Sequence, residues 1–108
     1  MSQNNIGEFE EVVLLTVAIL NGEAYGVSII DEMEKRLNRK VSIGALQTVL
    51  RRLEKKGLLN SAFGEATKIR GGKRKRFFSV TQHGMKLLNK AKEQRLSLWN
   101  AVHEIAFK

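Results

Sequence analysis

Apolar positions along the chain follow three short helical patterns, two strand patterns and one long helical pattern. In residues 8–20 they recur at intervals of three and four, the spacing of one helix face, and the same spacing predicts helices over 26–37, 42–56 and 82 to near the end. The positions expected to be buried in the first three helices are Phe9, Val12, Val13, Thr16, Val17 and Leu20, then Val27, Ile29, Ile30, Met33 and Leu37, then Ile43, Leu46, Val49, Leu50 and Leu53.

Turn and capping residues support these boundaries. Asn21-Gly22 ends the first helix, Ser42 is a good N-cap for the third, and Gly57 is suited to the left-handed stop after it. Two alternating segments, 58–63 and 75–80, predict a hairpin. The order of elements predicts a mainly α fold with a small two-stranded β-hairpin (α+β). This is a winged helix–turn–helix in residues 1–80 followed by a dimerisation helix in 81–108, together one compact unit.

Length and composition exclude several classes of protein. The chain has 108 residues, enough for one domain, and no cysteine for a disulfide or a Cys-based metal site. Its longest apolar run, 12–20, is too short to span a bilayer and follows glutamates rather than a basic stretch, so no membrane association and a cytoplasmic location are expected. His83 and His103 are too far apart for a one-turn metal pair. No nucleophile–base arrangement is visible, and neither an enzyme nor a cofactor is expected.

Charge is strongly segregated. Residues 1–34 hold seven acidic side chains and no Lys or Arg, whereas residues 35–108 hold all 19 Lys and Arg residues against four acids. The net charge of +8 is therefore the sum of −7 in residues 1–34 and +15 in residues 35–108, so one part of the fold presents a positive field. A polyanion is the usual partner of such a surface, although a basic protein can also be basic only for solubility.

The helix over 42–56 is short enough to lie in the major groove of duplex DNA. Gln47 could pair with an adenine edge, and Arg51 or Arg52 could bond a guanine or a phosphate. A solvated helix face is the plainer alternative, and Arg52 could instead pair with a neighbouring acid. The expected DNA-contacting residues of this helix are Ser42, Ala45, Gln47, Thr48, Arg51, Arg52 and Lys55.

The loop of the hairpin, the wing over 64–76, supplies a second basic element. Its glycines allow a close approach to a phosphate backbone or entry into the minor groove, although a solubilising loop is the alternative. The expected contacts here are Lys68, Arg70, Lys73, Arg74, Lys75 and Arg76.

The last helix carries apolar side chains at alternating spacings of three and four. This is a heptad seam of a kind that pairs two helices, so a homodimer is expected. The alternative is a helix that packs only on its own domain. The seam comprises Leu88, Ala91, Arg95, Leu98, Val102 and Ile105, with Trp99 in a neighbouring stripe of the same interface.

A family pattern is visible in residues 23–26 (EAYG) followed by Ile29-Ile30, 42–46 (SIGAL), 50–58 (LRRLEKKGL), the glycine-basic wing, 76–78 (RFF) with 80–81 (VT), and Gly84. In these segments the chain resembles the PadR family of transcriptional regulators, in particular its short members with one C-terminal helix. The resemblance implies a homodimeric repressor that binds double-stranded DNA at an inverted repeat. It also implies dimerisation through the last helix, helped by the first, and a groove between subunits in which Trp99 could contact a flat aromatic ligand.

The chain departs from the family pattern inside the third helix. Gln47 and Thr48 stand where the family usually has Tyr-Pro, so a different operator is expected. The last helix is also basic in its first half. A winged-helix module that binds RNA or a protein partner, without operator specificity, remains the alternative function.

Overall fold

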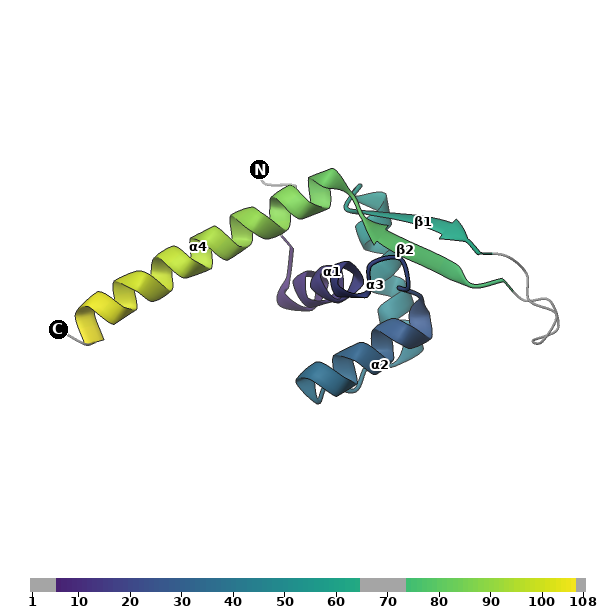
Figure 1. Ribbon diagram of the computed structural model, residues 1–108, viewed down its shortest axis with the longest axis horizontal. Helices are drawn as coiled ribbons and strands as arrows, with labels where there is room; N and C mark the ends of the chain where they lie inside the picture. Colours follow the sequence, from purple (N-terminus) through teal and green to yellow (C-terminus); the bar gives the residue numbers. More distant parts are fainter. Residues whose placement is uncertain (1–5, 65–73, 107–108) are drawn as a thin grey trace.

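The computed structural model describes residues 6–64 and 74–106 and contains four helices and one hairpin in the predicted order. The elements are α1 Glu8–Leu20, α2 Gly26–Leu37, α3 Ile43–Lys55, β1 Leu59–Phe63, β2 Arg76–Val80 and α4 Gln82–Ala106. Figure 1 shows α1, α2 and α3 packed together, with the hairpin and α4 leaving this body in opposite directions. The mainly helical winged helix–turn–helix predicted from the sequence is confirmed.

The predicted caps shape the ends of the helices. The Ser42 hydroxyl accepts a hydrogen bond from the Ala45 N–H (3.1 Å) at the start of α3, and the Thr81 hydroxyl accepts one from the Gly84 N–H (3.0 Å) at the start of α4. Asn21, with φ of 37°, ends α1 in the left-handed region, and Gly57 adopts φ of 78° after α3. The turns at Asn21 and Gly57 set the angles at which α2 leaves α1 and the hairpin leaves α3.

The hairpin is antiparallel, with Leu59 opposite Val80 and Phe63 opposite Arg76. An isolated antiparallel β-bridge between Ala24 and Phe78 connects the segment just before α2 to β2. On the face that includes Leu59 and Phe78, side chains point into the core near the root of the hairpin. Toward the wing the same face carries Phe63 and Arg76, which are exposed.

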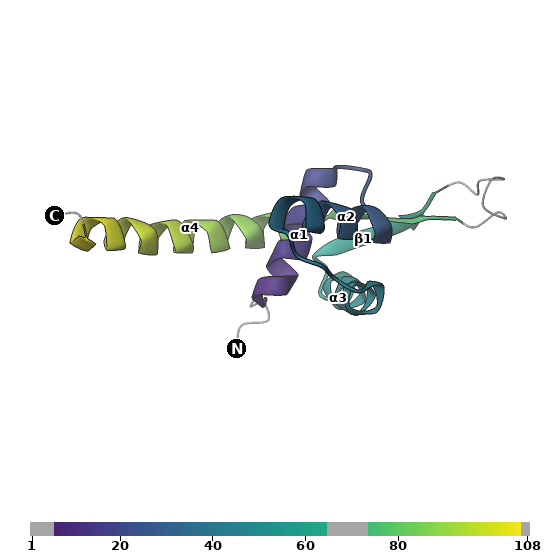
Figure 2. The same cartoon turned by 90° about the horizontal axis from the view of Figure 1, so that it is seen from below.

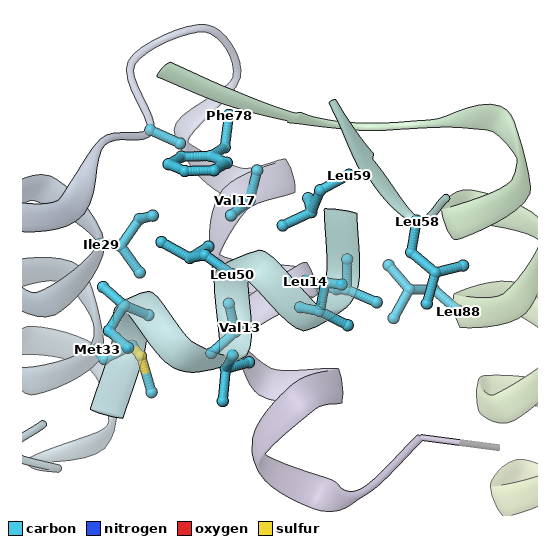
Figure 3. Packing of buried hydrophobic residues seen from close by; sticks show 14 of the residues in the cluster. Val13, Leu14, Val17, Ile29, Met33, Leu50, Leu58, Leu59, Phe78 and Leu88 are labelled. Carbon is cyan, nitrogen blue, oxygen red and sulfur yellow. The ribbon is translucent and has the colours of Figure 1, made fainter. Parts of the chain in front are cut away.

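One core holds the elements together, and Figure 3 shows its side chains converging from α1, α2, α3, the hairpin and the first turns of α4. Gly84, Leu87 and Leu88 of α4 are buried, so the beginning of the last helix belongs to the core of the winged domain. The buried apolar residues are Val13, Leu14, Val17, Ala24, Ile29, Met33, Leu46, Val49, Leu50, Leu53, Leu58, Leu59, Phe78, Leu87 and Leu88.

Three expected core positions are wrong. Val27, Leu37 and Ile43 are about half exposed, because α2 and α3 turn their Ile29- and Leu46-bearing faces inward and these three lie at the helix ends, beyond the edge of the core. In α1 the expected stripe missed Leu14, which is fully buried, and Glu10, whose burial is explained by the ion pairs described below.

After its first turns α4 leaves the body of the molecule (Figure 2). Residues 92–106 of this helix are all exposed. In the described part of the chain, no helix is both long and apolar enough to cross a membrane.

Candidate nucleic-acid interface

The outward face of α3 is polar and cationic. Gly44, Thr48, Arg51 and Lys55 follow the spacing i, i+4, i+7, i+11 and lie opposite the buried leucines of the helix, and all four are exposed. The Thr48 hydroxyl donates to the Gly44 carbonyl (3.0 Å) within the helix. Among the described residues Arg51 has no hydrogen-bond or ion-pair partner, so its guanidinium is available to an anion.

A neighbouring face of α3 turns toward the hairpin and forms one wall of a groove of about 430 Å³. Gln47 and Glu54, two turns apart, line this wall, and the opposite wall comes from β2 and the residues just before it. The groove is lined by Tyr25, Gly26, Val27, Ile43, Gln47, Leu50, Arg51, Glu54, Arg74, Lys75, Arg76 and Phe78. It thus brings Gln47 and four predicted DNA-contacting cations from two separate segments around one space.

Among the described residues that line this groove, Glu54 is the only carboxylate. Its carboxylate accepts hydrogen bonds from Arg76 Nη2 (3.2 Å) and from the Ser61 hydroxyl (2.6 Å), and Ser61 Oγ in turn accepts one from Arg76 Nε (2.9 Å). These bonds join the last turn of α3 to both strands of the hairpin. Arg76 therefore fastens α3 to the two strands of the hairpin, a role that its place in a basic run does not reveal.

The two cations before β2 are held by aromatic rings. Arg74 Nε donates to the Gly64 carbonyl (3.1 Å), and its guanidinium lies 5.7 Å from the centre of the Phe63 ring. Lys75 Nζ lies 4.2 Å from the centre of the Tyr25 ring. Cation–π contacts at such exposed sites hold a side chain in place without neutralising its charge. The other expected wing contacts, Lys68, Arg70 and Lys73, lie outside the described residues.

Arg52 differs from Arg51 because it points toward α1. Its guanidinium lies 3.8 Å from the carboxylate of Glu10, which also pairs with Lys56 Nζ (3.2 Å) and accepts the Gly7 N–H (2.9 Å). Burial alone would raise the pKa of the Glu10 carboxyl, but these partners outweigh it and hold the pKa below its ordinary value of 4.5. Glu10 is therefore ionised at neutral pH and fastens α1 to the end of α3.

The predicted interface residues of α4 fall into two groups. Leu88 is only 6% exposed, which is a correction to the seam, because this side chain is already covered by its own domain. Ala91 is half-buried, and Arg95 Nη2 bonds Glu11 of α1 at 2.7 Å, which accounts for a cation in an apolar stripe. Leu98, Trp99, Val102 and Ile105 are exposed, Leu98 by 68% and Ile105 by 79%.

A second groove, of about 490 Å³, lies between the first turns of α4 and the beginning of α1. Ile6, Leu87, Ala91 and Leu98 contribute apolar surface to it, but Trp99 does not line it. Within the described segments no group of three or more His, Asp or Glu residues is arranged to hold a metal ion.

Among the groove residues that the sequence patterns missed, Glu54 and Ile43 matter most for the site. Glu54 could have been predicted from the sequence, because it lies seven residues after Gln47 and so shares its face of the helix. Ile43 was assigned to the core because it is apolar and in register with Leu46 and Leu50, and no sequence signal separates it from them.

Comparison with known proteins agrees with this architecture. The model of the PadR-like family of transcriptional regulators matches residues 14–90. A PadR-like transcription factor from Bacteroides fragilis is 25% identical, with a TM-score of 0.76 over 90% of this chain and 88% of that one. A PadR family regulator from Eggerthella lenta is 22% identical, with a TM-score of 0.71 over 91% and 80% of the two chains.

A PadR-like regulator from Bacillus cereus is 19% identical, with a TM-score of 0.71 over 91% of this chain and 90% of that chain. No curated protein sequence matches significantly. Members of the matched family are DNA-binding transcription regulators and not enzymes. On the strength of the family model, which spans most of the domain including α3 and the wing, the chain belongs to the PadR-like family of transcriptional regulators.

Proposed function

We propose that the protein is a homodimeric, sequence-specific repressor in the cytoplasm that binds an inverted-repeat operator. In this proposal α3 lies in the major groove, and the wing follows the backbone or enters the minor groove. Residues 1–80 form the DNA-binding unit, and the helix in 81–108 carries the dimer contacts. The observation that supports it most is the groove between α3 and the hairpin, where Arg51, Arg74 and Lys75 surround Gln47.

The groove suits one strand of a duplex. A helix in the major groove and a wing reaching the adjacent minor groove must straddle the sugar-phosphate backbone between them, and cations on both walls match that charge. Gln47 then faces base edges from the first half of α3, where a glutamine can bond adenine in two places. Phosphate contacts supply affinity, whereas Gln47 supplies sequence preference.

The proposal of a dimer is supported by the exposed apolar surface of α1 and α4. Leu98, Trp99, Val102 and Ile105 lie on α4 beyond the domain, and Leu15 of α1 is 44% exposed. A helix in water with so many uncovered large side chains lacks the packing that normally stabilises helices. A second copy would cover these side chains and place two α3 helices on successive major grooves, about 34 Å apart. An aromatic ligand at Trp99 would then bind between the subunits.

The test is selection of bound duplexes from a random pool, followed by titration of the selected sequence over a range of salt concentrations. We expect an inverted repeat whose affinity far exceeds that of random duplex. Equal affinity for every sequence would refute operator recognition and favour the RNA- or protein-binding alternative.

Arg51→Ala and Arg52→Ala form a matched pair for the orientation of α3. Loss of one phosphate contact lowers the slope of log K against log salt by roughly one unit, and we expect this for Arg51→Ala. Arg52 is occupied by Glu10, 3.8 Å away, so its removal should change the slope much less. The opposite ranking would show that a different face of α3 meets the DNA.

A further inference from the structure

The end of the α3–hairpin groove nearest the start of α3 is apolar. Val27 and Ile43, 55% and 47% exposed, both line it, although the helical pattern assigned them to the core. Cations and amides line most of the remaining surface. Two branched aliphatic side chains are thus presented to solvent on the face that the proposed function assigns to DNA.

The position of Ile43 is set by its neighbours. It is the first residue of α3, directly after the Ser42 N-cap, and lies against the first residue of α2, Gly26. A Cβ built on Gly26 would stand 3.0 Å from Ile43 Cδ1, closer than ordinary van der Waals contact. The absence of a side chain at Gly26 lets Ile43 rest there, with its other side open to the groove.

Ile43 and Gln47 are one helical turn apart and line the same wall. In helix–turn–helix proteins the residues at the beginning of the recognition helix contact base edges. Ile43 has no hydrogen-bonding group, so what it can contact favourably there is an apolar feature of a base. In the major groove thymine alone among the four bases offers one, its C5-methyl group.

We propose that Ile43, with Val27 beside it, is a specificity-determining residue that contacts the C5-methyl group of a thymine in each half-site, next to the position contacted by Gln47. This inference rests on the proposed function. The surrounding charge favours DNA over an apolar protein partner, because Arg51 and Arg74 line the same groove and would be left in a dehydrated interface without counter-charges.

The test uses the selected operator with each thymine replaced in turn by deoxyuridine, which removes only the methyl group. Burial of one methyl-sized group corresponds to about a four-fold change in Kd, roughly 0.8 kcal/mol. We expect wild-type protein to lose about this much affinity at one thymine per half-site. Ile43→Ala should bind the thymine and deoxyuridine operators equally, and Ile43→Val should retain part of the preference.

Leu37→Ala is the matched control, because Leu37 is a similarly exposed aliphatic residue at the far end of α2. It should keep the full thymine preference. Thermal melting of each variant separates lost contact from lost folding, and Val27→Ala gives a second route should Ile43→Ala unfold.

Two results would overturn the inference while leaving the proposed function intact. One is a tightly bound operator at which no deoxyuridine substitution changes the affinity. The other is a thymine preference that survives unchanged in folded Ile43→Ala or, should that variant unfold, in Val27→Ala. Failure to prefer any duplex sequence would instead remove the proposed function, and this inference with it.

Discussion

Replacing Glu10 by glutamine should make the stability of the protein less dependent on pH in the acid range. The Glu10 side chain is 10% exposed, and its carboxylate is held by the Gly7 N–H and by Lys56 and Arg52. These partners keep its pKa in the folded protein below 4.5. A carboxyl whose pKa is lowered by folding stabilises the folded state above its unfolded pKa, and this stabilisation disappears as pH falls through the folded pKa.

The size of the effect follows from which partners remain. Glutamine can still accept the Gly7 N–H, so the variant loses mainly the charge-assisted contacts. The Lys56 and Arg52 side chains are 30% and 55% exposed, which lets water screen and solvate them once the carboxylate is gone. We therefore expect a loss of about 1–2 kcal/mol at pH 7 rather than the larger penalty of leaving a buried charge unpaired.

Urea unfolding followed by circular dichroism between pH 3 and 7, at fixed salt and protein concentration, measures this. The difference in unfolding free energy between wild type and Glu10→Gln should be constant near neutrality and shrink below pH 4.5. Glu34→Gln, at an exposed position of α2, is the control and should leave the profile unchanged. A difference that stays constant down to pH 3, or none at pH 7, would refute the assigned role of Glu10.

Three further predictions concern the dimer, the core and the wing. Leu98→Asp with Val102→Asp should produce monomers with reduced helix content, and an intact dimer in sedimentation equilibrium would contradict the proposed interface. Gly84→Ala should lower the melting temperature by roughly 5–15 °C, because the added Cβ would stand 2.5 Å from the Leu58 carbonyl oxygen. An unchanged melting temperature would contradict this packing. Glu54→Gln should weaken operator binding several-fold, because it releases Arg76, even though it also removes a negative charge from the groove. Tighter binding would show instead that Glu54 acts only by repelling phosphate.

The order and boundaries of the helices could be predicted because caps and periodicity agree locally. Ser42 and Thr81 cap helices in the structure as their residue types suggest, and Gly57 takes the left-handed conformation expected of it. Each of these signals concerns residues within one turn of each other, where the sequence directly determines hydrogen bonding.

Contacts between elements were harder to predict. Periodicity distinguishes one helix face from another but not where the core ends, so Val27 and Ile43 were placed inside although they lie at its edge. The partners of Arg52, Arg76 and Arg95 are acids 42, 22 and 84 residues away in sequence, at Glu10, Glu54 and Glu11. Such pairings depend on how the helices cross, which residue spacing within one helix does not encode.

The end of the hairpin nearest the wing, at Arg76 and Phe77, is fastened on both of its faces. Glu54 connects one face to α3 through Arg76, and the Tyr25 ring packs edge-on against Phe77 at 5.5 Å on the other, beside α2. These contacts hold α3, the start of α2 and the described strands of the hairpin in one fixed arrangement. In the proposed dimer, an effector would therefore act by changing the direction in which α4 holds this unit, and not by moving α3 against the hairpin. Regulation of this kind would change the distance between the two α3 helices of the proposed dimer and leave the structure of each winged domain unchanged.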